Sequence, residues 1–448
     1  MEEKIIKGIK YRLDKETLTA EVIQKKGYSG DIVIPETVVS NKVSYKVTAI
    51  GHSTFFNCKS LTSISIPDSV TTIGDSVFKC CESLTSINIS KSVINIGKQI
   101  FEHCKSLTTI VVDENNQVYD SRDNCNAIIH TVTNTLIFGC CKTNIPNSVT
   151  NIGNSAFESC PSFTAITIPD SVTSIGDFAF SFCDSLASVI IPNSVVNIGE
   201  GAFRCCESLT TINIPDSVTN IDLCVFLNCP SLTSIIVDEN NKVYDSRENC
   251  NAIIHTETDT LIAGCQNTII PQSVINIGIC AFGKCSTLTT ISIPDSVENI
   301  AEYAFYKCKS LSEINIPYSV TTIGSSAFED CESLTSFSIS DVPVEDEELY
   351  NQADNFFDNL GIGENLSLKI NSSSVFARCS SLTSVLISKH TTNIGNMTFD
   401  GCKSLIDIRY TGTIEQWQEI KLGTCWNRDI PTKIVHCTNG DVEVEIEE

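Results

Sequence analysis

The sequence predicts an α/β solenoid, in which the chain winds into stacked coils of about 23 residues. Three observations carry this prediction. Cysteines recur every 23 residues, one consensus unit surrounds twelve of them, and each unit has a phenylalanine at the same position. A fixed period of about 20–29 residues is typical of solenoids, because each unit can bury its apolar face only against its neighbours.

The consensus unit reads Ile-Gly-x-x-Ala-Phe-x-x-Cys-x-Ser-Leu-Thr-x-Ile-x-Ile-Pro-x-Ser-Val-x-x, and residues 175–197 are a clear copy. Leu-Thr-x-Ile-x-Ile predicts a short strand, since its leucine and isoleucines point into one core. Proline then ends the ladder pairing, because it has no N–H to donate. Ser-Val-x-x-Ile-Gly predicts a second extended leg that ends in a tight bend at glycine. Ala-Phe-x-x-Cys predicts a short helical turn on the outer side.

The repeated phenylalanine predicts a continuous aromatic spine through the stacked coils. Its members are Phe55, Phe78, Phe101, Phe157, Phe180, Phe203, Phe226, Phe282, Phe305, Phe328, Phe376 and Phe399. The chain has 23 cysteines, an odd number that cannot all pair internally. Equivalent side chains of stacked coils point the same way, which disfavours disulfides, so we expect buried free thiols that pack as small apolar residues.

Two cysteine steps of 56 residues carry nearly the same insert, at about 113–145 and 238–270. Each insert predicts a β-hairpin, with strands at Ala127–His130 and Leu136–Gly139 around Asn134 in the first copy. The copies are 125 residues apart, which indicates duplication of a whole block. A third irregularity, the acidic segment at about 341–370, predicts an elaborated coil rather than a linker between domains.

The inserts also hold residues that could bind metals. Possible zinc ligands are Cys125, His130 and Cys140, which recur as Cys250, His255 and Cys265. A structural zinc site usually requires four ligands, including two cysteines close together in the sequence, and each set offers only three. Possible calcium ligands at 113–116 and 238–241 lack the glycine and distal glutamate of an EF-hand loop, and Asx-rich turns explain them. The hairpin interpretation is favoured, and neither a metal nor a cofactor is predicted.

Charge and motifs argue against several classes of function. Lys+Arg number 30 against 54 Asp+Glu, and the net charge of −24 repels nucleic acid. Apolar runs are far shorter than the roughly 18–20 residues of a membrane helix, so no membrane insertion is expected. The sequence has no Gly-x-Ser-x-Gly elbow, no His-Glu-x-x-His and no phosphate loop, so an enzyme is not predicted.

The Leu-x-x-Ile-x-Ile core matches the leucine-rich repeat strand motif, and the whole unit resembles the BspA-like, or Treponema-type, leucine-rich repeat family over about residues 8–440. The resemblance implies a curved horseshoe with a parallel β-sheet on its concave face and the helical turns on its convex face. Members are mostly bacterial surface or secreted proteins that bind host proteins or other cells, with some protozoan relatives. The export signal common in the family is not visible at Met1–Lys10, so a cytoplasmic location stays open.

The resemblance also implies three parts: an N-terminal cap at 1–49, the repeat solenoid at 50–410 and a C-terminal cap at 411–448. In the last part, Thr413 to Gln416 form a capping box that predicts a short helix. Trp417 and Ile420 would share its inner face and cover the end of the core. A rival interpretation makes Trp417 and Trp426 a ligand-binding aromatic pair.

The second and third variable positions of Leu-x-x-Ile-x-Ile face outward, and we expect a small, hydroxyl-rich, nearly uncharged surface there. The candidate interaction residues on it are Ser188, Thr211, Asn213, Ser234, Thr290, Ser292, Glu313 and Asn315. Tyr303 and Tyr306 join them as aromatic residues outside the core pattern. The alternative is a sheet that is merely solvated.

Three hypotheses on function follow. The first is an adhesin-like surface scaffold, expected to be a monomer, that binds a protein or glycan. The second is an intracellular scaffold for a partner protein, favoured by the missing signal and by the thiols, which suit a reducing compartment. The third is a structural spacer with no partner.

Overall fold

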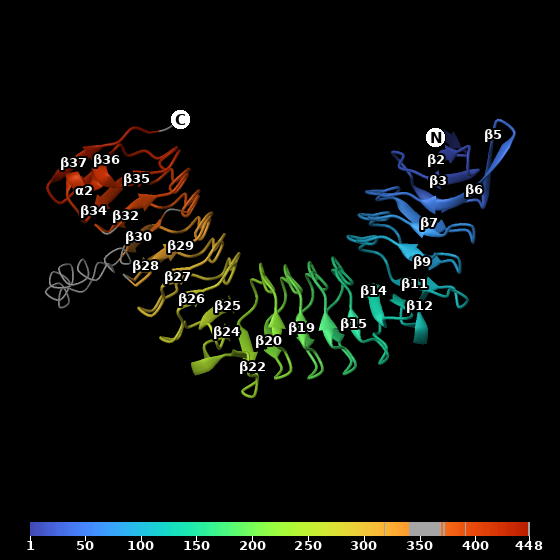
Figure 1. The fold of residues 1–448 in the computed structure, drawn as a ribbon, viewed down its shortest axis with the longest axis horizontal. Helices are drawn as coiled ribbons and strands as arrows, with labels where there is room; N and C mark the ends of the chain where they lie inside the picture. The colour runs from blue at the N-terminus through green and yellow to red at the C-terminus, as the bar shows by residue number, and fades with distance from the viewer. Residues whose placement is uncertain (318, 340–368, 371, 390, 447–448) are drawn as a thin grey trace. The chain divides into compact units, whose positions relative to one another are not determined.

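The computed structural model describes residues 1–317, 319–339, 369–370, 372–389 and 391–446. These residues form two compact units, Met1–Leu209 with Ser217–Val225, and Thr210–Asp216 with Phe226–Glu448. Within each unit the chain winds into stacked coils joined by parallel strands (Figure 1). The elaborated coil expected at 341–370 lies outside the described residues, apart from β31 (Lys369–Ile370).

The first unit begins with strands that pair antiparallel and then become parallel. β2 (Ile9–Asp14) pairs antiparallel with β1 (Glu2–Ile6) and β3 (Thr19–Val22). β6 (Val43–Ile50) pairs parallel with β3 and antiparallel with β5 (Thr37–Ser40). Parallel pairing continues through β8 (Thr72–Ile73) to β10 (Asn95–Ile96). The first strands therefore contribute buried side chains such as Tyr11 and Val22 to the same core as the first coils.

Most later coils supply two short strands, which we call the first leg and the second leg. First-leg pairs in this unit are β4 (Gly30–Val33) with β7 (Leu61–Ser65), β9 (Ser86–Ile89) with β11 (Thr109–Val112), and β16 (Ala165–Thr167) with β18 (Ser188–Ile190). Second-leg strands are β15 (Asn151–Ile152), β17 (Ser174–Ile175), β19 (Asn197–Ile198) and β21 (Asn220–Ile221). In both legs, partners such as Thr109 and Ser86 are one period apart, so the sequence repeat sets the register.

The insert interrupts the coils without ending the sheet. β12 (Tyr119–Asp120) leads through the 3-10 turn η1 (Arg122–Asn124) to β13 (Ala127–His130), which pairs antiparallel with β12 and β14 (Thr135–Gly139). β14 then pairs parallel with β15, which returns the chain to the second-leg stack.

The second unit repeats this plan. Its second-leg sheet follows the order β23 (Tyr244–Asp245), β24 (Ala252–His255), β25 (Thr260–Gly264), β26 (Asn276–Ile277), β27 (Asn299–Ile300), β29 (Thr322–Ile323), β31, β33 (Asn393–Ile394) and β35 (Lys421–Leu422), with η2 (Arg247–Asn249) after β23. Its first-leg strands are β20 (Thr211–Ile214), paired with β22 (Ser234–Val237), and then β28 (Glu313–Ile316), β30 (Ser336–Ile339), β32 (Ser384–Ile387), β34 (Asp407–Tyr410), β36 (Ile434–Cys437) and β37 (Gly440–Glu443).

The short helix predicted near the C-terminus is confirmed as α2 (Ile414–Glu419). Its N-cap, Thr413, accepts a hydrogen bond from the Gln416 N–H, and the Gln416 side chain accepts one from the Thr413 N–H, which completes the capping box. Trp417 is buried, with its ring centroid 5.4 Å from that of Tyr410 and 6.1 Å from that of Trp426. Both tryptophans are therefore part of the core that the last coils cover.

The helical turn expected at Ala-Phe-x-x-Cys is wrong, and the fold is a β-solenoid with almost no helix in its described part. Phe178, Phe180 and Phe182 each donate a backbone N–H to a carbonyl of the next coil, at 2.8 Å. The residues between them donate within their own turn, as Ser181 does to Phe178 at 3.0 Å. A helix would direct all these N–H groups into its own coil and leave the neighbour's carbonyls without donors.

This alternation places two residues of each turn in the left-handed region, four positions apart around the phenylalanine. Phe178 and Phe182 have φ of 53° and 57°. In most coils the residues with positive φ at these two turn positions are not glycines. Gly176 instead allows close approach, since a Cβ there would lie 2.7 Å from the Asn154 backbone nitrogen. The bend predicted for this glycine is thus a point of contact between coils.

Phenylalanine rings and thiols fill the core beneath these turns. Phe282, Phe305 and Phe328 stack with ring centroids 5.0 and 5.1 Å apart. The spine is not continuous in the first unit, because at the insert Phe138 packs edge-on against Phe101, 5.7 Å away. A T-shaped contact keeps the core filled where the next coil begins late.

The cysteines are thiols, and all but one of the twelve ladder cysteines are buried, as predicted. Packing is only part of their role. The Cys183 Sγ lies 3.3 Å from the Phe157 carbonyl oxygen of the preceding coil, and most ladder cysteines repeat this contact. Burial raises the pKa of the Cys183 thiol to about 12. The thiols therefore stay protonated and donate to a backbone oxygen between coils.

Substitution of one turn residue with positive φ, Ser53, tests the backbone conformation of the turn. Ser53 has φ of 53° and donates its N–H to Asp75 of the next coil at 2.9 Å. Glycine relieves the clash of the β-carbon in this region, whereas alanine keeps it. Ser53→Gly should have a free energy of unfolding about 1 kcal/mol above that of Ser53→Ala, measured by chemical denaturation. Equal stability of the two variants would contradict the assigned backbone conformation.

A stacked phenylalanine ring should contribute far more to the free energy of unfolding than an exposed phenylalanine ring does. Phe305→Ala should lower the free energy of unfolding by about 3–5 kcal/mol, because it opens a cavity between two stacked rings. Hydrogen exchange should rise first in the adjoining coils. Phe56→Ala is the control, since Phe56 is 40% exposed, and it should change stability little. Uniform loss of protection along the chain in Phe305→Ala would exclude coil-by-coil packing.

Candidate interaction site

The predicted interaction residues on the first-leg strands lie in rows across neighbouring coils. Ser188 is exposed on β18, and Thr211 and Asn213 are exposed on β20. Thr211 pairs with half-buried Ser234 of β22, and Asn213 pairs with Ile236. Within the second unit, strand alternation thus brings Thr211, Asn213 and Ser234 to one face of the first-leg strands, and in the first unit it turns Ser188 outward on β18.

The predicted residues farther along fall into two groups. Glu313 and Asn315 are exposed on β28, and the Ser338 hydroxyl of β30 donates to Asn315 Oδ1 at 2.8 Å. Thr290 and Ser292 are exposed, but that coil forms no regular strand at this point in the described chain. Their side chains are therefore exposed although no regular strand pairing fixes the backbone at this point.

Tyr303 and Tyr306 do not join the strand face. They lie in the turn between β27 and β28, with ring centroids 5.5 Å apart in a T-shaped contact. The Lys307 Nζ sits 5.0 Å from the centre of the Tyr306 ring. Their exposure follows from the turn geometry, since Tyr303 has φ of 57°. The structure thus separates the aromatic candidates from the strand candidates.

Exposed aliphatic side chains also lie on the first-leg face and were missing from the predicted set. Ile190 is 75% exposed, Ile236 is 53% exposed and Val111 is 43% exposed. Each occupies an outward position of its strand, so the alternation in the sequence contained the signal. They turn a hydroxyl-rich surface into one with apolar contact points.

A cleft of about 580 Å³ opens where β11 leads into the insert. Its walls are formed by Ile110, Val111, Val112, Asp113, Glu114, Asp120, Ser121, Arg122, Asn124 and Asn126. Val111 and Glu114 are exposed, and Asp113 is half-buried. The cleft therefore combines an apolar side chain with carboxylates.

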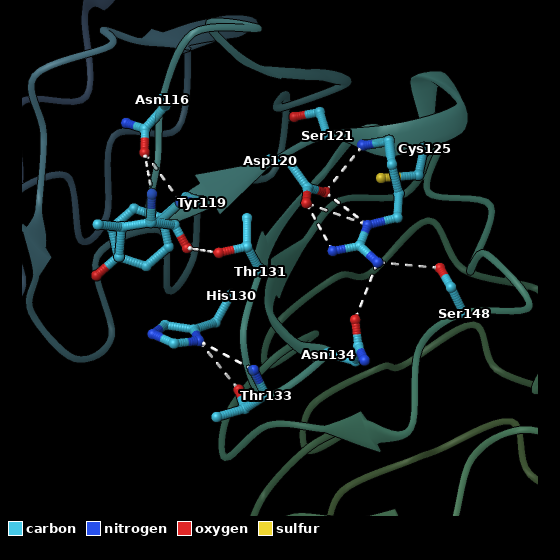
Figure 2. A network of polar contacts seen from close by, with 12 residues as sticks. Asn116, Tyr119, Asp120, Ser121, Cys125, His130, Thr131, Thr133, Asn134 and Ser148 are labelled. Atoms are coloured by element: carbon cyan, nitrogen blue, oxygen red, sulfur yellow. Dashed lines mark hydrogen bonds and ion pairs between the residues drawn. The ribbon is translucent and has the colours of Figure 1, made fainter.

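Arg122 is the only cationic side chain among the lining residues, and the carboxylate of Asp120, which Figure 2 labels, neutralises its charge. Its Nε and Nη2 donate to the two carboxylate oxygens of Asp120 at 2.9 and 2.6 Å. Its Nη1 donates to Asn134 Oδ1 at 2.9 Å. In the second insert Arg247 repeats the bidentate pair with Asp245, and Asp259 takes the place of the asparagine at 2.7 Å. The arginine thus holds the insert together and is not placed to bind an anion.

The possible metal ligands of the first insert have other contacts. Cys140 Sγ lies 3.5 Å from the Asn126 carbonyl oxygen, and His130 Nδ1 accepts from the Thr133 N–H at 3.3 Å. Asp113 Oδ1 accepts from the Asn115 backbone and side chain at 2.9 and 3.0 Å, which is an Asx turn. Within the described residues, no three His, Cys, Asp or Glu side chains are grouped to hold a metal ion.

A second polar feature, a cavity of about 20 Å³, lies where the first insert separates two turns. Glu102 and Glu158 both line it. Glu102 Oε2 is 2.6 Å from Lys79 Nζ, whereas Glu158 Oε2 is buried with no hydrogen-bond partner among the described residues. Burial raises the pKa of Glu158, and repulsion from Glu102 adds to this effect, while a hydrogen bond with the Ser155 side chain and the nearby Lys79 and His103 oppose it.

The duplicated block has no such carboxylates. Leu227 and Gly283 occupy the places of Glu102 and Glu158, and a Cβ on Gly283 would lie 2.6 Å from Leu227 Cδ1. The fold therefore does not need the glutamate pair, and the site belongs to the first block alone. Sequence reasoning missed it because the insert places its two residues 56 positions apart.

Comparison with known proteins identifies the family. Residues 37–139, 137–253, 262–362 and 348–429 match the model of the BspA type Leucine rich repeat region (6 copies). The chain therefore belongs to the BspA-type leucine-rich repeat family, which confirms the resemblance seen in the sequence. No curated protein matches the chain in sequence.

Solved structures of bacterial repeat proteins are similar to this chain. A leucine rich cell surface protein from Faecalibacterium prausnitzii A2-165 is 28% identical, with a TM-score of 0.56 over 94% of this chain and 98% of its own. A leucine-rich repeat protein from Bacteroides ovatus ATCC 8483 is 24% identical, with a TM-score of 0.40 over 97% of this chain and 91% of its own. Among the residues that the structure describes, no helix has the length and apolar character to span a bilayer.

The raised pKa of half-buried Glu158 should make the free energy of unfolding depend on pH. A raised folded pKa means that the contribution of Glu158 is fully present below its usual value of 4.5 and is lost as the pH rises through the folded value. Relative to wild type, Glu158→Gln should therefore gain stability as the pH rises from 4 towards 8, measured by urea denaturation across that range. Glu102→Leu with Glu158→Gly, which copies the second block, should show the same trend. Glu257→Gln is the control for an exposed carboxylate, and a parallel pH profile for Glu158→Gln and wild type would refute the assignment.

Proposed function

We propose that the protein is a non-enzymatic interaction scaffold, adhesin-like, that binds a partner protein through the exposed face of its first-leg strands. The observation that carries this proposal is that the first-leg strands of each unit turn polar and aliphatic side chains outward together, Ser188 with the exposed Ile190 in the first unit and Thr211 and Asn213 with the exposed Ile236 in the second. The F. prausnitzii relative is described as a leucine rich cell surface protein, which supports a surface location. The parts at 1–49 and 411–448 serve as caps in this proposal.

The chemistry of the row suits a broad contact of modest strength. β18, β20 and β22 present hydroxyl, amide and aliphatic groups, but no aromatic or arginine side chain, the types that dominate hot spots. Affinity then comes from many coils contacting the partner together. A glycan is the less favoured ligand, because aromatic platforms are missing from these three strands.

A second candidate is an intracellular scaffold for a partner protein. The favouring observation is the set of thiols, several with a Sγ directed at a backbone oxygen. Oxidation would remove those donors, and free thiols persist best in a reducing compartment. Fractionation of native cells separates the two candidates, since the first requires the protein at the cell surface.

The experiment for the strand face compares charge insertions of equal size. Partners captured by the wild-type protein are identified, and the affinity of each purified partner is then measured. Ile190→Glu with Ile236→Glu should weaken binding at least tenfold, since it puts charges where apolar contact is expected. Val132→Glu with Ile269→Glu is the control, because these side chains are 82% and 75% exposed and lie in the inserts, outside the first-leg strands. Equal affinity of the strand-face variant and the control would rule out this face.

A further inference from the structure

The coil before the first insert lacks one of its regular backbone contacts with the coil that follows. In most coils the spine phenylalanine donates its N–H to a carbonyl of the next coil, as Phe78 does to Ile100 at 3.0 Å. Phe101 holds the same position one coil later, but its N–H has no hydrogen-bond partner among the residues that the structure describes. Phe101 is only 7% exposed, so this donor is buried.

The insert explains why the contact is missing. In an uninterrupted stack Phe101 would donate to the carbonyl of Ala156, the residue before the next spine phenylalanine. Gly139, at the end of β14, donates to that carbonyl instead, at 2.8 Å. A Cβ on Gly139 would clash with the Phe157 ring, so the insert lies directly against the next coil. The Phe101 N–H is therefore separated from the carbonyl that it would otherwise contact.

Two more polar atoms without partners belong to the cavity of about 20 Å³ that Phe101 lines. They are Glu158 Oε2 and Ser159 Oγ, both buried and both without a hydrogen bond within the described chain. Ser159 is only 5% exposed. The other carboxylate at the cavity, that of Glu102, is already paired with Lys79 Nζ at 2.6 Å. Buried polar groups are nearly always hydrogen-bonded to protein or to ordered water, so three exceptions at one cavity need a common explanation.

The chemistry of these three groups selects the species that satisfies them. The Phe101 N–H needs an acceptor, the ionised Glu158 carboxylate needs a donor, and the Ser159 hydroxyl can act as either. A metal cation cannot accept from an N–H group, and a halide ion cannot donate to a carboxylate. Water does both. A cavity of at least about 10–15 Å³ with two to four polar partners holds one water molecule, and this cavity meets both conditions.

We propose that the cavity binds one water molecule, which accepts from the Phe101 N–H, donates to Glu158 Oε2 and has the Ser159 hydroxyl as its third partner. The water replaces the direct backbone bond that the insert removes, and so links the coil before the insert to the coil after it. This inference goes beyond the proposed function and does not depend on it, because no residue of the strand face takes part.

A high-resolution crystal structure of the full chain tests the site directly. It should show one ordered water molecule at about 2.7–3.2 Å from both Phe101 N and Glu158 Oε2. Direct contact between the Glu158 carboxylate and Phe101 N, with no water between them, would overturn the proposal. An empty cavity would overturn it too, as would a bound atom with the all-oxygen coordination of a hard metal ion.

NMR of the deuterated, ¹⁵N-labelled chain tests the same site in solution. The Phe101 amide proton should show a cross-peak to a long-lived water molecule. The Phe78 amide is the matched control and should show none, because it donates to the Ile100 carbonyl. Ser159→Ala should keep the Phe101 cross-peak, since two partners of the water remain, and this result would exclude magnetisation transfer through the serine hydroxyl. Absence of the cross-peak from the wild-type protein would contradict the proposal.

The duplicated block supplies a variant that should lose the water. In that block Leu227 and Gly283 replace the two glutamates, and a Cβ on Gly283 would lie 2.6 Å from Leu227 Cδ1, so an apolar side chain fills the space. Glu102→Leu with Glu158→Gly should therefore abolish the Phe101 cross-peak, while an unchanged Phe78 amide resonance shows that the variant is folded. Persistence of the cross-peak in this double variant would show that the glutamate does not hold the water, and the proposed site would be wrong.

Discussion

The hydrogen bonds between successive coils are the constraint on which the rest of this structure depends. Strand partners are 23 residues apart, as in Ser188 and Ala165, and turn partners such as Phe180 and Ala202 are 22 apart. Three lines of backbone contact, along the two legs and the turn, therefore have nearly the same step. A buried backbone group without a partner costs about as much as a lost hydrogen bond, so every coil must present its N–H and carbonyl groups where its neighbour needs them.

The repeated residues follow from this demand on the backbone. Close approach of coils requires glycine at positions such as Gly176, and outward donation from the turn forces residues such as Phe178 into the left-handed region. The ring beneath the turn must stack at the same step, as Phe305 does on Phe282. The ladder thiol supplies one more donor between coils, from Cys183 to Phe157. The residue types of the repeat are thus set mainly by the need to pair every backbone N–H and carbonyl group between coils. Burial of apolar side chains is the second requirement.

The sequence predicted the features that depend on period and alternation. Strands such as β18, the buried phenylalanines and thiols, and the capping box before α2 all follow from residue type and spacing. The outward direction of Ser188 and Asn213 was predictable for the same reason. The turn at Ala-Phe-x-x-Cys was misjudged as helical, because local propensity contains no information on the carbonyls of the next coil. The pairing of Glu102 with Glu158 needed three dimensions, since it arises only when the insert closes back onto the stack. The sequence already placed Ile190 and Ile236 at outward strand positions, but their large exposed fractions, 75% and 53%, which mark them as apolar contact points, needed the structure.

The coil-to-coil ladder has a mechanical consequence within each compact unit. A coil at the end of a stack is held by hydrogen bonds and one ring contact to a single neighbour, so a pulling force detaches coils in sequence instead of shearing many at once. Each detached coil of 23 residues lengthens the chain by about 80 Å at roughly 3.4 Å per residue. Tension is then relieved in many small steps, and the coils still stacked keep their shape. A protein built this way behaves as an extensible tether, able to lengthen under load while the surfaces of its remaining coils stay intact.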